Sequence, residues 1–181
     1  FDESSIAGSW SPDSLILDSV ALVSETHEIL SHGSITGDRL RIFLDVASAK
    51  EDTLFPYLSI EQYRTDLDLN AFLTGTIENW ELRGSGDVRD FEYGGALVPE
   101  GEVKIAVRKL DTYEVLFDLS GDSCHVDPLA FSGINLSLEY WKDVTTVKRL
   151  HLTGDGVEAE MRGEVRSGGE GTSILISETR I

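Results

Sequence analysis

A cysteine beside a histidine is the first arrangement in this sequence that could do chemistry. Cys124 is followed directly by His125, and Asp127 lies two positions further on. Such a trio can supply a nucleophile, its base and an orienting carboxylate, but neighbours on a loop rarely converge on one point. The surrounding loop offers no cation other than His125 to lower the pKa of the thiol. We therefore expect no catalytic residues and no enzyme.

Three polar residues, Asp66, Asp68 and Asn70, imitate the first ligands of a calcium-binding loop. That loop needs a glycine at its sixth position and a bidentate carboxylate at its twelfth, where this chain has Ala71 and Ile77. The three residues are more simply the solvent face of a strand. The histidines lack metal-ligand spacing and are expected at the surface or at strand edges: His27, His32, His125 and His151. The sequence predicts no metal site and no cofactor.

The composition is strongly acidic. Fifteen Lys and Arg residues stand against 33 Asp and Glu, which gives a formal net charge of -18. Binding to phosphate backbones or anionic membranes depends on Lys and Arg, so nucleic acid is not an expected partner. The acidity is typical of a solvated outer face, with adaptation to high salt as the alternative.

Other features of the sequence limit the possible domain organisation. The single cysteine excludes an internal disulfide. No apolar run approaches the roughly 18 residues that span a bilayer, and the chain begins at Phe1 without a start methionine or a signal-type segment. We expect residues 1–181 to form a single β domain within a longer repetitive protein, with any anchoring segment outside this range.

Apolar and polar residues alternate along most of the chain, which is the pattern of half-buried strands. We expect strands around 39–46, 66–73, 102–108, 114–119 and 134–139. Each has one apolar face, formed by Leu40, Ile42, Leu44 and Val46; Leu67, Leu69 and Leu73; Val103, Ile105 and Val107; Val115 and Phe117; and Leu136 and Leu138. The pattern favours an antiparallel, nearly all-β chain.

Turn formers separate these runs at 84–87, 93–95, 99–101 and 120–122. One segment departs from the β pattern. Residues 47–63 suit a short helix or two helical turns, and Pro56 is expected to bend or end the first of them.

A weak internal echo runs through the chain at a constant offset of 130 residues. The pattern Val20, Leu22, Ile29, Gly33, Ile35 returns as Leu150, Leu152, Ala159, Gly163, Val165. Both stretches read as two facing strands joined by a polar turn, at 24–26 and 154–156. Two interpretations stay open: one period of a repetitive, elongated β protein followed by the start of the next, or the coincidence that any two amphipathic strand pairs can produce.

Residues 73–79 read Leu-Thr-Gly-Thr-Ile-Glu-Asn, and they are followed by Gly84, Gly86 and a Tyr-Gly pair at 93–94. This order resembles the repeat of the TamB family (the translocation and assembly module subunit) and its AsmA-like relatives: Leu, any residue, Gly-Thr-Leu, any residue, Asn-Pro, then glycine and Tyr-Gly. The resemblance extends upstream to Leu-Phe-Pro-Tyr-Leu at 54–58 and downstream to the strand pair beginning at Val147. Two features depart from the family: the strong acidity, and Trp80 in place of the proline. They leave open which member of the family this chain resembles.

The resemblance implies a curled, half-pipe or taco-like antiparallel sheet with an open apolar inner face. It also implies a periplasmic location, in an inner-membrane-anchored protein that bridges the two membranes. The expected function is non-catalytic: carriage of phospholipid along the groove, or assistance to outer-membrane protein assembly beside a barrel partner of the TamA type. The fourteen apolar residues named above would contact the phospholipid acyl chains, each buried methylene contributing about 0.8 kcal/mol.

Alternatives remain from the residues alone. The same apolar faces could close on each other as the core of an ordinary β-sandwich, in an interaction or carbohydrate-binding module. Unpaired edge strands could also allow self-association.

Overall fold

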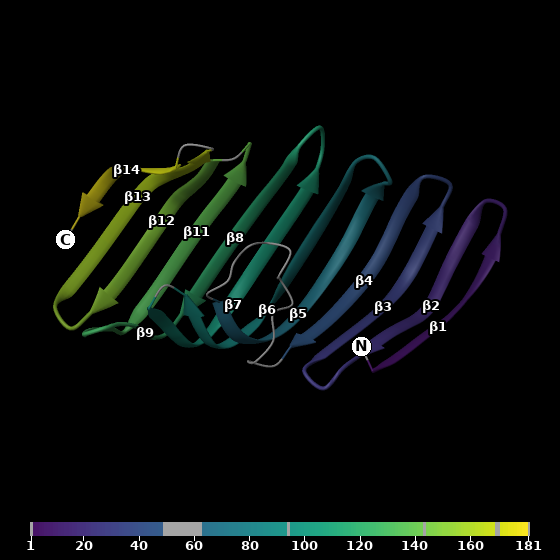
Figure 1. The fold of residues 1–181 in the computed structure, drawn as a ribbon, viewed down its shortest axis with the longest axis horizontal. Coiled ribbons are helices and arrows are strands. Elements are labelled where there is room, and N and C mark those ends of the chain that lie inside the picture. The colour runs from purple at the N-terminus through teal and green to yellow at the C-terminus, as the bar shows by residue number, and fades with distance from the viewer. Residues whose placement is uncertain (1, 49–62, 94, 143, 169–170, 181) are drawn as a thin grey trace.

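A single antiparallel sheet of fourteen strands makes up the described part of the chain (Figure 1). The computed structural model describes residues 2–48, 63–93, 95–142, 144–168 and 171–180. The strands are β1 (Glu3–Ser11), β2 (Ser14–Val23), β3 (His27–Thr36), β4 (Arg39–Ser48), β5 (Tyr63–Thr76), β6 (Trp80–Tyr93), β7 (Ala96–Lys109), β8 (Tyr113–Gly121), β9 (Cys124–Val126), β10 (Leu129–Phe131), β11 (Gly133–Trp141), β12 (Val144–Gly154), β13 (Val157–Gly168) and β14 (Gly171–Arg180).

Consecutive strands are neighbours almost throughout. The order across the sheet is β1 to β8 and then β11 to β14, while the short β9–β10 hairpin lies off this path and pairs with the start of β7. The expected all-β, open antiparallel sheet is confirmed. The expected helix at 47–63 falls almost wholly outside the described residues; Ala47 and Ser48 end β4, and Tyr63 begins β5.

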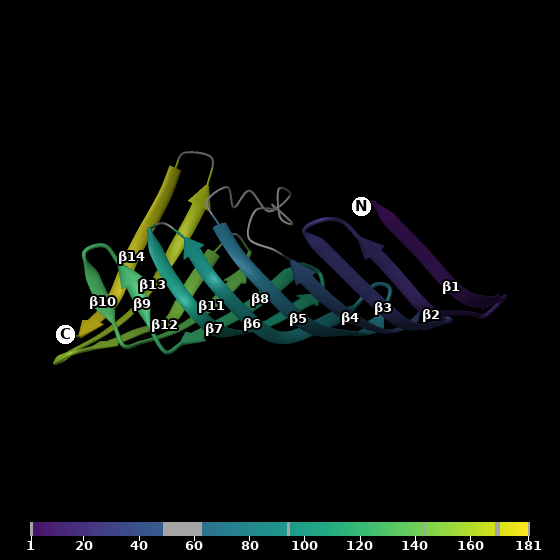
Figure 2. The same cartoon turned by 90° about the horizontal axis from the view of Figure 1, so that it is seen from below.

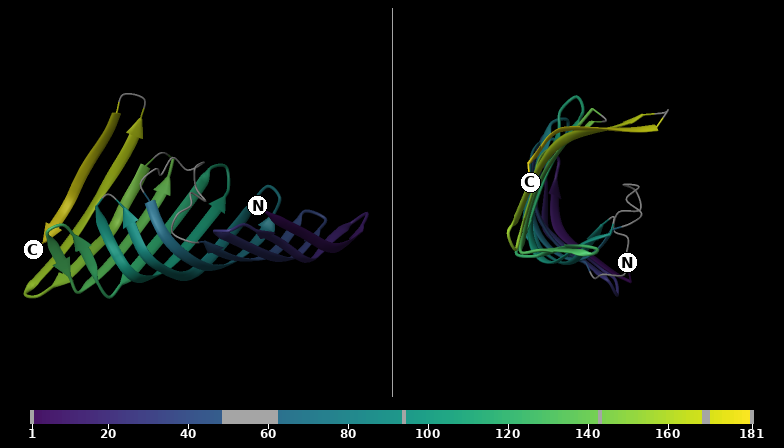
Figure 3. Two further views of the ribbon diagram at one scale, coloured as in Figure 1. Left: turned by 60° about the horizontal axis from the view of Figure 1, so that its bottom comes forward. Right: turned by 90° about the vertical axis from the view of Figure 1, so that its left-hand side faces the viewer.

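The sheet is strongly curled. Seen from its end, it has a C-shaped cross-section that is open on one side (Figure 3). The side view shows how the long strands β5 to β7 bend upward near the β9–β10 hairpin (Figure 2).

The apolar face is the inner face of the curl. Val88, Val103 and Leu119 are only 2–5% exposed, although no second sheet covers them in the described chain. They are covered because the sheet folds over itself: the start of β7 and the β9–β10 hairpin bring Val98, Cys124 and Phe131 into the same cluster. The polar neighbours on the other face, such as Asp87 and Glu102, are exposed.

Two expected turns are wrong. Residues 84–87 lie in the middle of β6, and residues 99–101 lie inside β7. The glycines of β6 serve close packing: a Cβ on Gly86 would lie 1.9 Å from the Asp68 carbonyl oxygen of the neighbouring strand. The turn signals at 93–95 and 120–122 do mark strand ends.

Pro99 is tolerated inside β7 because of its place in the pairing. One edge of β7 pairs with β8 from Gly101 onward and with β9 at Ala96 and Leu97, so Pro99 falls between the two ladders. Toward β6 it stands opposite Asp90, which has a positive φ of 51° and interrupts that ladder. The missing amide proton of Pro99 therefore removes no ladder hydrogen bond.

We expect Gly86→Ala to destabilise the fold by about 1–3 kcal/mol, because the added methyl meets backbone that cannot move aside cheaply. Ser85→Ala is the matched control: Ser85 is the exposed neighbour on the other face, and surface changes usually stay within about 0.5 kcal/mol. Urea denaturation measures both. Equal midpoints for the two variants would contradict the close approach of β5 and β6.

Candidate functional site

All fourteen apolar residues singled out in the sequence lie on one face of the sheet. Because facing residues of paired strands point to the same side, the register can be followed from strand to strand. The rows that cross the sheet are Leu40, Gly75, Trp80, Lys109, Tyr113; Ile42, Leu73, Leu82, Val107, Val115; Leu44, Ala71, Gly84, Ile105, Phe117, Leu138; Val46, Leu69, Gly86, Val103, Leu119, Leu136; and Ser48, Leu67, Val88, Gly101, Gly121, Ile134. We call this surface the apolar groove.

The groove continues over strands that the alternation did not identify. On one side its rows reach Leu17 and Val20 of β2, and on the other they reach Val147 and Leu150 of β12. A bulge in each of these strands changes the alternation from odd to even positions, between Leu17 and Val20 and between Val147 and Leu150. A search for strict alternation therefore does not find these two strands. Alternation that resumes after a shift of one residue is nevertheless a pattern in the sequence that indicates a bulged strand.

Most of the groove is half-buried and therefore accessible from one side. Twelve of the fourteen residues are neither buried nor fully exposed. The other two, Leu67 and Val103, are 9% and 5% exposed and belong to the core cluster at the closed end. The groove thus has a packed end near the β9–β10 hairpin and an open stretch around Leu44, Ile105 and Leu138.

Charge is almost absent from the groove. Among the described residues of the five rows, Lys109 is the only charged side chain. It lies at the rim, in the row of Trp80 and Tyr113, whose rings are 6.1 Å apart between centroids. The rim therefore combines amphipathic aromatic rings with one cation, while the interior is aliphatic.

The opposite face carries the ion pairs. Arg108 Nε lies 2.6 Å from Glu81 Oε1 and Arg108 Nη1 lies 3.0 Å from Glu114 Oε2, which joins strands β6, β7 and β8. The hydrogen bond from Arg108 is the main cause of the lowered pKa of Glu81. These pairs are only partly buried, so water screens them and each adds little to the stability of the sheet.

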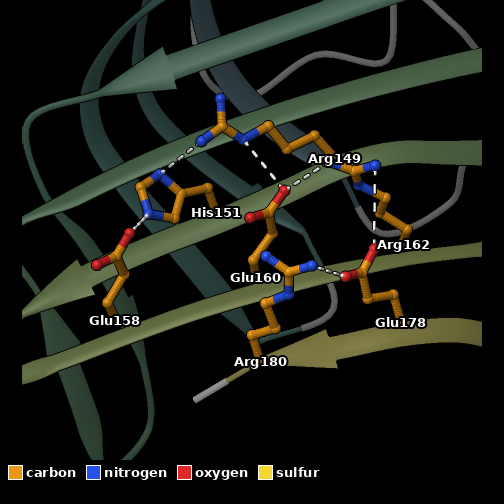
Figure 4. Close-up of polar contacts among 7 residues, drawn as sticks. All are labelled: Arg149, His151, Glu158, Glu160, Arg162, Glu178 and Arg180. Carbon is orange, nitrogen blue, oxygen red and sulfur yellow. Dashed lines mark hydrogen bonds and ion pairs between the residues drawn. The ribbon is translucent and has the colours of Figure 1, made fainter.

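A second ion-pair network covers β12 to β14 on the outer face (Figure 4). Arg162 Nη2 donates to Glu160 Oε1 at 3.0 Å, and this bond is the main cause of the lowered pKa of Glu160. His151 Nε2 lies 2.8 Å from Glu158 Oε1, and the His151 side chain is half-buried. His32 and His125 are exposed, as expected, whereas His27, the first residue of β3, is buried and not at the surface. The network places cations and carboxylates side by side, an arrangement that the net charge alone does not reveal.

One aromatic row interrupts the polar outer face. His32, Phe43 and Phe72 face one another in register on β3, β4 and β5. The centroids are 4.9 Å apart for His32 and Phe43 and 4.3 Å apart for the two phenyl rings, and both pairs are stacked. Such cross-strand pairs stabilise the sheet, so this row has a structural explanation.

The thiol, imidazole and carboxylate considered for catalysis do not form a centre. Cys124 does not lie on a loop, as the sequence suggested, but begins β9 and is 0% exposed. Burial raises the pKa of its thiol. Cys124 and His125 are consecutive residues of β9, so their side chains point to opposite faces of the strand, and both His125 and Asp127 are exposed. Cys124 packs in the core cluster.

The calcium-like residues also remain ordinary strand positions. Asp68 and Asn70 are exposed on β5, and Asp66 is half-buried. Within the ranges that the structure describes, no three His, Cys, Asp or Glu side chains are close enough to hold a metal ion.

Comparisons with known proteins add no assignment. No family model, curated protein or solved structure matches this chain. In the described part of the chain, no helix is long and apolar enough to cross a membrane.

Because its thiol is buried and its pKa is raised, we expect Cys124 to react with iodoacetamide about tenfold or more slowly in the native chain than in urea. The rate should rise with pH as the thiolate forms. Alkylation is followed by mass spectrometry, with the urea-unfolded chain as the control. Equal rates in the two states would show that the closed end of the groove is not packed.

Proposed function

We propose that the chain is a non-catalytic segment of a lipid conduit, in which phospholipid acyl chains lie in the apolar groove. One observation carries the proposal: five rows of facing residues cross the sheet with a single charged side chain, Lys109 at the rim. Monomeric soluble proteins rarely expose continuous apolar surfaces of this kind unless the surface binds something.

The energetics support an acyl chain as the ligand. Each buried methylene contributes about 0.8 kcal/mol, so a 16-carbon chain gains on the order of 10 kcal/mol before the costs of immobilisation. Away from the rim, the rows stay free of charge from strand to strand while the size of the residues varies; one row passes from Leu44 through Ala71 and Gly84 to Ile105 and Leu138. An acyl chain can therefore move from strand to strand without meeting a charged side chain, which favours transport over tight storage.

The rim gives the headgroup a place. A phosphate is attracted to the one cation of these rows, Lys109, and the rings of Trp80 and Tyr113 suit the boundary between apolar and wet surroundings. The acidic outer face is repelled by an anionic membrane surface. We therefore expect lipid to bind in the groove and not on the outer face.

The resemblance to the TamB and AsmA-like family supplies the setting of the proposal. It favours a periplasmic bridge between membranes and a barrel partner of the TamA type. In that setting an unfolded outer-membrane strand is the competing cargo, and it would use the same apolar face. The β-sandwich alternative loses its support, because the described strands form one sheet and no second sheet closes the groove.

We expect folded Ile105→Asp protein to bind at least tenfold less fluorescent phosphatidylethanolamine than the parent, because a carboxylate in the groove must lose water when an acyl chain covers it. Ser85→Asp is the matched control: it adds the same charge on the neighbouring strand, on the exposed outer face. Circular dichroism establishes that each variant is folded, and Leu69→Asp serves as the second groove variant.

Unchanged lipid binding by folded Ile105→Asp and Leu69→Asp proteins would remove the groove proposal. Native mass spectrometry of the purified parent identifies the cargo directly. Capture of an unfolded barrel polypeptide, with no bound lipid, would replace the lipid conduit by the assembly function.

A further inference from the structure

Strands β1 to β3 and strands β11 to β13 have the same register. Each of the nine residue pairs between β1 and β2 recurs between β11 and β12, 130 residues later; thus Ser4–Leu22 becomes Ile134–Leu152. The eight pairs between β2 and β3 recur in the same way between β12 and β13. Even the hydrogen bond before the first pair recurs, from the Asp2 amide to Val23 and from the Ser132 amide to Thr153.

The irregularities of the two units coincide as well. The β1–β2 register shifts between Ala7 and Gly8, and the β11–β12 register shifts between Ser137 and Leu138. The same two bulges are seen in the pairing with the next strand, between Leu17 and Val20 of β2 and between Val147 and Leu150 of β12, so one bulge in β2 corresponds to one in β12. Bulges are specific features of a strand and have no reason to recur at one offset by chance. The shared bulge therefore favours a structural repeat over coincidence.

A glycine stands at the same point of both units for the same reason. A Cβ on Gly33 would lie 2.1 Å from the Arg41 carbonyl oxygen, and one on Gly163 would lie 2.5 Å from the Leu175 carbonyl oxygen. In each unit the glycine faces the strand just before its bulge, at Leu17 and Val147. The two units thus share a position where only glycine fits against the neighbouring backbone, although few of their side chains are identical.

The two units differ in what lies beside their first strand. β11 pairs with β8 from Ile134 to Trp141, whereas the corresponding edge of β1 pairs with none of the described strands. The exposures follow from this difference. Trp10 is 80% exposed and its counterpart Tyr140 is 39% exposed; Ile6 is 74% exposed and its counterpart Leu136 is half-buried.

The edge of β1 has few features that prevent pairing. Proteins usually protect a free edge with lysine, proline or inward-pointing charge. β1 reads Glu-Ser-Ser-Ile-Ala-Gly-Ser-Trp-Ser, and Glu3 at its start is its only charged residue. Nine residues without an internal charge or proline offer an open row of backbone donors and acceptors.

We propose that the free edge of β1 is a strand-pairing site that takes an antiparallel strand of the β8 type, supplied by another unit of the same 130-residue repeat. The register is that of the β8–β11 pair. Ile6 then faces the position of Leu119, Gly8 that of Phe117 and Trp10 that of Val115. Gly8 leaves room for the phenyl ring. This pairing holds whatever the groove carries, so it does not rest on the lipid proposal.

A synthetic peptide of residues 112–122, which contains β8, tests the site on the intact chain. Hydrogen exchange measured by mass spectrometry should slow at least tenfold in residues 3–11 when the peptide is in excess, because added strands protect the amides with which they pair. The control is the chain with Ile6→Asp and Trp10→Asp; both side chains are exposed in the parent, so we expect this variant to fold, which circular dichroism checks. It should show no protection, because the carboxylates would meet the apolar face of the peptide.

A tandem chain provides the second test. Residues 1–130 fused to residues 1–181 place the second copy of β1 where β11 follows the β9–β10 hairpin. We expect the second β1 to exchange as slowly as β11 does in the parent, and the Ile6→Asp, Trp10→Asp form of the second copy to lose this protection. Fast exchange of β1 in both experiments overturns the proposal, as does protection by the peptide at β14 in place of β1.

Discussion

The cross-strand register is the constraint on which the rest of this structure depends. Because side chains alternate with a period of two, a slip of one residue in any pair would turn one strand's apolar set outward. The bulge in β2 shows how the constraint is kept. Leu15 and Leu17 precede it and Val20 and Leu22 follow it, and the shift brings all four to the same face. The bulge therefore preserves the groove where strict alternation would have broken it.

A single curled layer leaves the protein with a small core and a large half-buried surface. The fully covered side chains, Val98 and Cys124, lie at the end where β7 and the β9–β10 hairpin fold over the sheet. Elsewhere the groove residues are covered only by their neighbours. In a sandwich, a second sheet would bury these faces. Here their remaining apolar area is available to a ligand, and a ligand that covers it would also stabilise the sheet.

Local pattern was enough to predict the class of fold and the facing of the groove. The alternation around Leu40, Val103 and Phe117 identifies both the strands and the side on which they are apolar. The expected turns at 84–87 and 99–101 were wrong because contacts between strands, and not turns, explain the glycine and the proline there. Gly86 allows the close approach of β5, and Pro99 lies in the gap between two ladders. The burial of Cys124 depends on a fold-over of distant strands, which no local pattern contains.

The repeat links the architecture to the proposed transport. From β1 to β11 the sheet advances by eight strands, which at about 4.8 Å per strand is roughly 38 Å of groove. Because both units share register and a bulge, a strand of the β8 type paired with β1 would continue the rows through Ile6 and Trp10 without turning them. A conduit needs rows that continue from unit to unit in this way, because adding units must lengthen it without changing its cross-section or its apolar lining. A closed sandwich core could not be lengthened in this way, because its two sheets would have to extend together.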